Sequence, residues 1–189
     1  ENNVGFSFEN ADAYWLSEKS PNYWLDHGFL QSDLNFYMPP PMERILETKV
    51  ERHFFSYYKN WRPQEHYYYA AENTGFQANP EGRSEGTYSK YASLDDKIDS
   101  FHFYFMLLKF GIGRATSDAA HEIREGVILR EEAVQLVRRY DTEFPEKNFK
   151  VFLDYCEFTD EEFWAICKRW RNLNLWEKKE GEWVLKYQV

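Results

Sequence analysis

The sequence predicts a mostly helical fold with a minor β component that includes a C-terminal β-hairpin. After residue 93, apolar residues recur at helical spacing in five successive stretches. Between residues 175 and 185, apolar ends flank a charged turn that contains Gly181, which is the pattern of a β-hairpin. Before residue 93 the pattern is mixed, with short elements separated by irregular chain.

The composition indicates a folded protein with a core rich in large rings. The chain has 189 residues, which fits one ordinary domain, and 20% of them are aromatic. This ring content is far above that of an acidic disordered chain. The formal net charge of −9 argues against a nucleic-acid partner, because phosphate contacts need a basic face.

The first sixty residues contain short candidate elements. Residues 4–8 alternate apolar with small or polar residues in the manner of a strand. The proline run at 39–41 introduces an apolar pattern that predicts a helix over residues 42–50. The ring-dense segment 53–58 suits a buried strand.

A second helix and a long loop follow. Pro63 suits the first helical position of a helix over residues 64–73, and Gly75 suits its C-cap. Residues 74–93 are rich in Gly and small polar residues and predict a loop of functional length. The rings in this loop favour an ordered loop that packs on the rest of the domain.

The helical half begins with a helix predicted over residues 94–110. Ser93 suits its N-cap, and Asp95 and Asp96 suit its first turn, where the helix dipole favours acids. A capping box of Thr159 and Glu162 opens the last predicted helix. The four helices after the first are predicted over residues 116–125, 129–140, 148–155 and 159–170.

The cysteines and the longest apolar run indicate the cellular compartment of the protein. Cys156 and Cys167 lie on two successive predicted helices, without a second Cys pair or clustered His. We interpret them as buried, unpaired thiols of a cytoplasmic protein, with a disulfide or metal pair as the alternative. The longest apolar run, 103–108, is too short to span a bilayer, and the given N-terminus lacks a secretory signal pattern.

A glycine turn before the second of these helices is a candidate anion site. Gly111 and Gly113 precede Arg114, so backbone N–H groups and a guanidinium could approach one phosphate together. The alternative is a plain helix–helix turn that needs positive φ at glycine, with Arg114 solvated or in a salt bridge. A lone Gly-x-Gly does not decide between them.

Neighbouring charges offer further candidates. Lys97 and Lys109 lie about 18 Å apart on one predicted helix, so they cannot both touch one phosphate. Asp95, Asp96 and Asp99 could provide oxygen ligands for Mg²⁺, and the alternative is ordinary compensation of the helix dipole by acids in the first turn. The histidines show no zinc-site spacing, and the common nucleotide-binding glycine motifs do not occur.

Several motifs follow one another in fixed order. They are YSKY and SLDDKID within 88–99, KFGIGRAT at 109–116, EIREG at 122–126, REEA at 130–133, YD and EFP within 140–145, and TDEEFW at 159–164. Together they strongly resemble the C-terminal part of the N-acetyl sugar amidotransferases. These are ATP-dependent enzymes of bacterial surface-polysaccharide biosynthesis, including lipopolysaccharide and O-antigen.

The resemblance implies a chemistry and its partners. The family resembles the PP-loop ATP pyrophosphatases, which have an α/β fold like that of the adenine nucleotide alpha hydrolases. ATP with Mg²⁺ would activate the N-acetyl carbonyl oxygen of a sugar nucleotide, and ammonia from a glutaminase partner would displace it to give an acetamidino group. By the same resemblance, Lys97, Lys109 and Arg114 would contact phosphate, and Asp95 or Asp96 would lie near Mg²⁺.

One departure from the family pattern limits this expectation. The phosphate-cradling Ser-Gly-Gly-x-Asp-Ser motif is not in this sequence, which begins at Glu1. We therefore expect a C-terminal part with a mixed segment at 1–92 that continues from a missing PP-loop domain, a helical region at 93–172 and a hairpin at 173–189. Alone it would bind no cofactor tightly and would be inactive. The alternative is a non-catalytic interaction module or a degenerate remnant, docked on a nucleotide-binding or glutaminase subunit.

Overall fold

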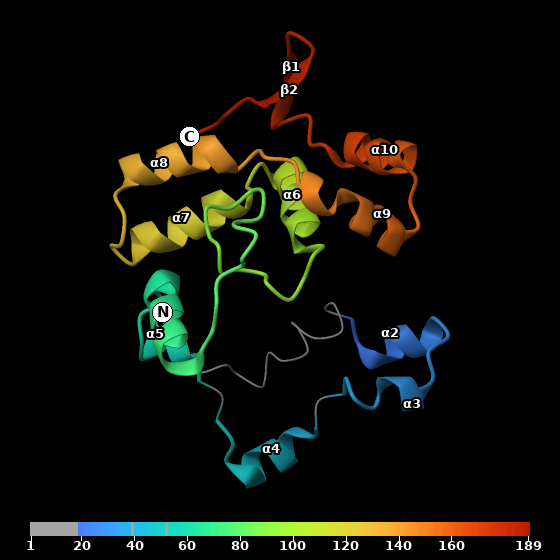
Figure 1. Cartoon of the computed structure of the whole chain (residues 1–189). Coiled ribbons are helices and arrows are strands. Elements are labelled where there is room, and N and C mark those ends of the chain that lie inside the picture. Colours follow the sequence, from blue (N-terminus) through green and yellow to red (C-terminus); the bar gives the residue numbers. More distant parts are fainter. Residues whose placement is uncertain (1–18, 39, 52) are drawn as a thin grey trace. The chain divides into compact units, whose positions relative to one another are not determined.

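The computed structural model describes residues 19–38, 40–51 and 53–189 (Figure 1). The chain divides into two compact units, of which the first ends at Trp61 and the second spans Arg62–Val189. The described residues are mostly helical and end in a two-stranded hairpin, which confirms the predicted fold class. The strand predicted over residues 4–8 lies outside the described residues, and the predicted boundaries after residues 92 and 172 stay predictions.

The first unit consists of short helices and buries little. Only Leu34 among its described hydrophobic residues is buried. The buried strand predicted over residues 53–58 is wrong, because this segment is exposed and has a 3₁₀ turn at 55–57, with an isolated bridge at His53 in place of a strand. The rings of His53 and Tyr58 stack on each other, so they contact local neighbours instead of a sheet. The elements are α2 (Pro21–Asp26), α3 (Gln31–Leu34), α4 (Met42–Thr48) and η3 (Phe55–Tyr57).

The second unit begins with helix α5 (Pro63–Thr74). Pro63 occupies its first position, and Gly75 closes it with a left-handed φ of 73°. Both predictions are confirmed, since proline fixes a helical φ and glycine accepts a positive φ without strain. The chain then runs without regular structure to Ile98, as the loop prediction requires.

Helix α6 (Asp99–Phe110) begins later than its predicted first residue, Leu94. Ser93 takes a left-handed φ of 53°, and its hydroxyl hydrogen-bonds to the carboxylate of Asp99. The backbone N–H of Ile98 donates to Oδ1 of Asp96 at 2.8 Å. These bonds hold the intervening residues in a bend, so the predicted N-cap at Ser93 and the first-turn placement of Asp95 and Asp96 are wrong.

The remaining helices confirm the predicted order with small shifts at their ends. Thr159 and Glu162 form the predicted capping box, in which the N–H of Glu162 donates to Oγ1 of Thr159 at 3.2 Å. Figure 1 shows α7 and α8 side by side, in agreement with their close packing. The helices are α7 (Arg114–Arg124), α8 (Arg130–Tyr140), η4 (Glu146–Asn148), α9 (Phe149–Cys156) and α10 (Asp160–Trp170).

The predicted C-terminal hairpin is confirmed. Strands β1 (Trp176–Lys179) and β2 (Glu182–Leu185) pair antiparallel, with Trp176 opposite Leu185. Glu180 and Gly181 form the two-residue turn with φ of 53° and 93°. Two successive positive φ values match the twist of the paired strands, which is why glycine suits the second position.

The core of the second unit is built from rings of α6, α9 and α10. Phe101 and Phe163 are fully buried, and Phe101 stacks on Phe152 with ring centroids 4.2 Å apart. Burying each such side chain contributes about 1.5–3 kcal/mol. The core residues are Phe101, Leu107, Leu108, Phe152, Phe163, Cys167 and Trp176.

Both cysteines are unpaired, as predicted. Cys167 is buried in the core, and burial raises the pKa of its thiol to about 12. Cys156 is only half-buried, so the prediction of a buried thiol is confirmed for Cys167 and wrong for Cys156. Among the described residues, no helix is both long and apolar enough to cross a bilayer.

Candidate functional site

The glycine turn between α6 and α7 holds an anion that belongs to the chain itself. The carboxylate of Asp141 accepts hydrogen bonds from the N–H of Gly113 at 3.0 Å and from the N–H and hydroxyl of Thr116 at 2.8 and 2.7 Å. Asp141 is only 5% exposed. The N–H groups at the start of α7 therefore bind a carboxylate of the chain itself, and the candidate phosphate contact at Gly111 and Gly113 stays a prediction.

Glycine is required at the two positions of this turn for different reasons. Gly111 has a φ of 70°, the left-handed conformation that glycine adopts freely. Gly113 has a negative φ, but a Cβ there would lie 2.5 Å from Oδ1 of Asp141 and 2.8 Å from its carbonyl oxygen. Glycine is needed at position 113 because the Asp141 carboxylate approaches the backbone so closely.

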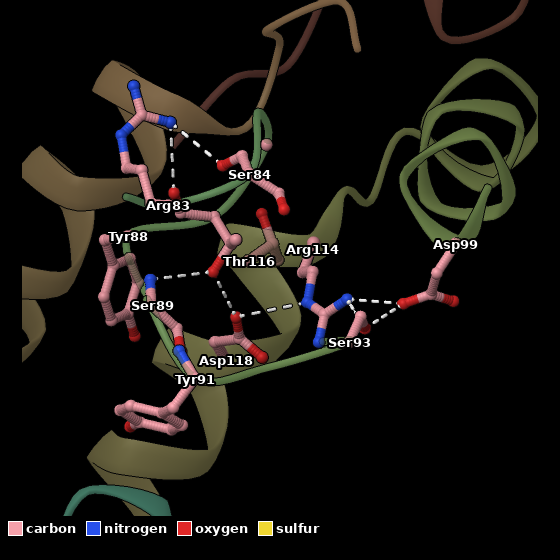
Figure 2. Close-up of polar contacts among 12 residues, drawn as sticks. Arg83, Ser84, Tyr88, Ser89, Tyr91, Ser93, Asp99, Arg114, Thr116 and Asp118 are labelled. Carbon is pink, nitrogen blue, oxygen red and sulfur yellow. Dashed lines mark hydrogen bonds and ion pairs between the residues drawn. The ribbon is translucent and has the colours of Figure 1, made fainter. Parts of the chain in front are cut away.

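Arg114 is also bound by the chain's own acids, as Figure 2 shows. Its Nη1 lies 2.7 Å from Oδ2 of Asp99 and 2.7 Å from the hydroxyl of Ser93, and its Nε lies 3.8 Å from Oδ2 of Asp118. Its guanidinium also stacks over the ring of Phe103 at 4.4 Å. This geometry favours the salt-bridged alternative for Arg114, and its predicted contact with phosphate stays a prediction.

The two predicted lysines lie in different surroundings. Lys109 packs its ammonium over the rings of Trp170 and Phe110, with distances of 4.7 and 5.3 Å to their centroids. Lys97 is exposed and lines a pocket that neither Lys109 nor Arg114 lines. Their predicted roles as phosphate ligands stay predictions.

The predicted magnesium ligands Asp95 and Asp96 are exposed. Asp96 lines the same pocket as Lys97, and its Oδ1 is already hydrogen-bonded to the backbone of Ile98. In the part of the chain that the structure describes, no three His, Cys, Asp or Glu side chains are grouped to hold a metal ion. Mg²⁺ is commonly bound by one or two carboxylates together with substrate phosphates, so this site would need oxygens from outside the chain. It stays a prediction.

The pocket lies between the long loop and the turn before α9. Its volume is about 340 Å³. Polar and apolar surface contribute about equally to its wall, with apolar contact from Ala78, Pro80 and Leu94. The lining residues are Gln77, Ala78, Asn79, Pro80, Glu81, Ser84, Ser93, Leu94, Asp96, Lys97, Lys147 and Asn148.

The charges of the pocket balance. Nζ of Lys147 lies 2.5 Å from Oε2 of Glu81, and this hydrogen bond lowers the pKa of the Glu81 carboxyl. Lys97 lowers that pKa slightly further through its charge, but makes no hydrogen bond or ion pair with any described residue. With Asp96 and Glu81 against Lys97 and Lys147, the formal charge of the lining is zero.

Two hydrogen-bonded pairs hold the long loop after α5 against the segment between α8 and α9. Arg83 binds Glu143 through two nitrogens, at 2.6 and 2.7 Å, and stacks over the ring of Tyr140. Burial alone would raise the pKa of Glu143, but the hydrogen bonds from Arg83 and from the N–H of Gly86 lower it. The N–H of Lys147 donates to Glu85 at 3.1 Å, which joins the loop to η4.

The next residues of the loop bind α7. The hydroxyl of Thr87 donates to Asp118 at 3.0 Å, and the hydroxyl of Tyr88 donates to Glu122 at 2.9 Å. Burial raises the pKa of both carboxyls. These contacts hold residues 83–88 of the loop, next to the segment that lines the pocket.

Sequence reasoning identified only part of this pocket. It singled out Asp96 and Lys97 and the functional length of the loop, but missed Gln77, Lys147 and Asn148. The only signal in the sequence for these residues is the polar character of the long loop and of the turn before α9. That signal does not show that the loop and the turn lie next to each other.

Residues 85–189 match a protein family described as LPS biosynthesis protein WbpG-like, C-terminal domain. The chain belongs to this family. The WbpG-like match covers more than half of the chain, including α6 to α10 and the hairpin. It confirms the expectation of lipopolysaccharide biosynthesis at the level of the family. Comparison with curated proteins gave no match.

Proposed function

We propose that this chain is the substrate-binding C-terminal part of an ATP-dependent N-acetyl sugar amidotransferase that acts in the cytoplasm. The enzyme would convert the N-acetyl group of a sugar nucleotide to an acetamidino group during lipopolysaccharide biosynthesis. The WbpG-like family and the ordered motifs from residue 88 to residue 164 support this proposal.

The observation that carries the proposal is the polar pocket of the second unit. Its volume of about 340 Å³ lies within the range of small-molecule sites, which is about 300–1,000 Å³. Its lining offers carboxamides, hydroxyls and both signs of charge, the groups that recognise a sugar through hydrogen bonds.

The proposed chemistry divides between this chain and its partners. The acetyl oxygen would attack the α-phosphorus of ATP, bound with Mg²⁺ by a PP-loop domain, and displace pyrophosphate. The attached AMP makes that oxygen a good leaving group, since an amide oxygen leaves poorly on its own. Ammonia from a glutaminase subunit would then replace that oxygen, which departs with AMP. The part of this chain is to hold and orient the sugar, which reduces the entropy cost of the reaction.

A titration of the full chain tests this function. With UDP-N-acetylglucosamine as the probe, we expect NMR shifts of backbone amides that line the pocket, such as those of Ala78, Ser84 and Asn148. ATP without the sugar serves as the control and should bind far more weakly. The proposal fails if UDP-N-acetylglucosamine and other nucleotide-linked N-acetyl sugars leave the spectrum unchanged at millimolar concentration.

Docking on a partner is a second candidate function, favoured by the first unit. Phe36 and Phe55 are 96% and 73% exposed there, and large exposed apolar surface is typical of interaction sites. The partner would be the nucleotide-binding or glutaminase subunit. Replacing both rings by Ser should then weaken binding to that subunit without changing sugar-nucleotide binding, and unchanged association would exclude this role.

A further inference from the structure

We infer that the pocket takes the uncharged N-acetyl sugar ring of the substrate, while the diphosphate stays outside it beside Lys97. This inference rests on the proposed function and adds which end of the sugar nucleotide the pocket recognises. It keeps the phosphate contact expected from the sequence for Lys97, but differs from that expectation for Lys109 and Arg114, which lie near the glycine turn and do not line the pocket.

The charges of the pocket do not suit a diphosphate. Glu81 neutralises Lys147 at 2.5 Å, and Asp96 precedes Lys97, so no net positive charge faces the cavity. Tight binding of a diphosphate needs opposite charge or several N–H donors in the same place. The N–H of Lys147 at the adjoining turn already donates to Glu85.

The other anion-binding groups predicted from the sequence are occupied as well. Asp141 accepts from Gly113 and Thr116 at the start of α7, and Asp99 pairs with Arg114 at 2.7 Å. A phosphate at either place would first have to displace a carboxylate. The second unit therefore offers a diphosphate no prepared site among these groups.

The hydrogen-bonding groups of the pocket suit a neutral ring. Within the described residues, the carboxamides of Gln77 and Asn148 make no hydrogen bond, although both line the cavity from opposite segments. Each carboxamide has two donors and an acceptor, which can pair with sugar hydroxyls and with the acetamido group. Leu94 and Pro80 offer apolar contact for the acetyl methyl and for the C–H face of the ring.

Lys97 is available to contact the diphosphate of the sugar nucleotide. It is exposed at the pocket and makes no ion pair with any residue that the structure describes. An exposed lysine contributes modestly to a phosphate contact because solvent screens its charge. Its removal should therefore affect a sugar nucleotide more than a sugar without phosphate.

The test compares three small probes with the full chain by saturation-transfer NMR and titration. The probes are methyl N-acetyl-β-glucosaminide, methyl β-glucoside and inorganic pyrophosphate. We expect the acetyl methyl of the first to receive the strongest transfer, the second to bind more weakly, and pyrophosphate not to compete. Lys97→Ala should weaken UDP-N-acetylglucosamine about threefold more than it weakens the glycoside.

Variants of pocket residues test where the N-acetyl glycoside binds. Gln77→Ala with Asn148→Ala should weaken the N-acetyl glycoside about tenfold, for the loss of hydrogen bonds from two side chains. Gln135→Ala, an exposed glutamine of α8 that does not line the pocket, is the matched control and should bind like the wild type. Amide spectra of each variant report whether it folds.

Three results would overturn the inference. Pyrophosphate could displace the glycoside, the double variant could bind like the wild type, or the glycoside could fail to bind at all. If UDP-N-acetylglucosamine still binds the wild type in any of these cases, the proposed function stands and only the assignment of the pocket fails. If no nucleotide sugar binds, the proposed function fails too.

Discussion

Replacing Asp141 by Asn removes the charge that holds the start of α7. The carboxylate accepts two hydrogen bonds at Oδ2 and one at Oδ1, all from Gly113 and Thr116. An Asn side chain can place its oxygen at the position of Oδ2, where it keeps the hydrogen bonds from Gly113 and from the Thr116 hydroxyl. Its NH₂ group then lies at the position of Oδ1 and faces the N–H of Thr116, so that hydrogen bond is lost. One charge-assisted bond is worth about 1.5–3 kcal/mol, and the charge at the helix N-terminus adds about 0.3–1 kcal/mol. We therefore expect Asp141→Asn to lower the free energy of unfolding by about 2–4 kcal/mol.

Urea unfolding followed by tryptophan fluorescence measures this loss, because Trp176 is buried in the core of the second unit. Asp154→Asn is the matched control, since Asp154 is an exposed acid on α9 that, among the described residues, pairs only with the exposed Lys150. That control should change stability by less than about 0.5 kcal/mol. The reasoning is refuted if Asp141→Asn is as stable as the control, with an unchanged slope in urea.

Three further predictions follow from the same unit. Gly113→Ala places a Cβ against Asp141 and should cost about 1–3 kcal/mol in urea unfolding, whereas a neutral effect would mean that the turn adapts freely. Glu143→Gln should destabilise the protein by about 1–3 kcal/mol at pH 7. Because the pKa of Glu143 is lowered in the folded state, its contribution is present above the usual glutamate pKa and is lost as the pH falls through the folded value, so wild type and variant should converge in acid. A difference in the free energy of unfolding between wild type and Glu143→Gln that persists in acid would contradict this. In the native protein at pH 8, a thiol reagent should modify Cys156 well before Cys167, whose pKa of about 12 and burial protect it, and equal rates would show that the core opens easily.

The helices after residue 99 were predictable because their signals are local. Thr159 and Glu162 cap α10 within four residues of each other, and Gly111 ends α6 through its own backbone conformation. The hairpin turn at Glu180 and Gly181 depends on the same kind of short-range preference. Signals of this kind can be recognised in the sequence without any knowledge of distant contacts.

The failures arise where distant residues decide the conformation. The predicted start of α6 was wrong because the hydroxyl of Ser93 binds Asp99 and accepts from Arg114, 21 positions away. The glycine turn does bind an anion, but that anion is the carboxylate of Asp141, 28 positions beyond Gly113, and a phosphate there stays a prediction. No local pattern links these residues.

The pocket shows the same limit. Lys97 could be selected from its own segment, whereas Asn148 joins it only because Arg83 and Glu85 tie the loop to the region before α9. These contacts span about sixty residues of sequence. Spacing and periodicity carry no information at that range.

A crystal structure of the full chain with UDP-N-acetylglucosamine tests most directly whether this pocket is the sugar site. We expect the acetamido-sugar ring in the pocket, within hydrogen-bond distance of Gln77 and Asn148, with the diphosphate outside and near Lys97. A diphosphate inside the pocket would contradict the inference about the ring, and a sugar nucleotide bound elsewhere on the chain would contradict the pocket's role as a whole.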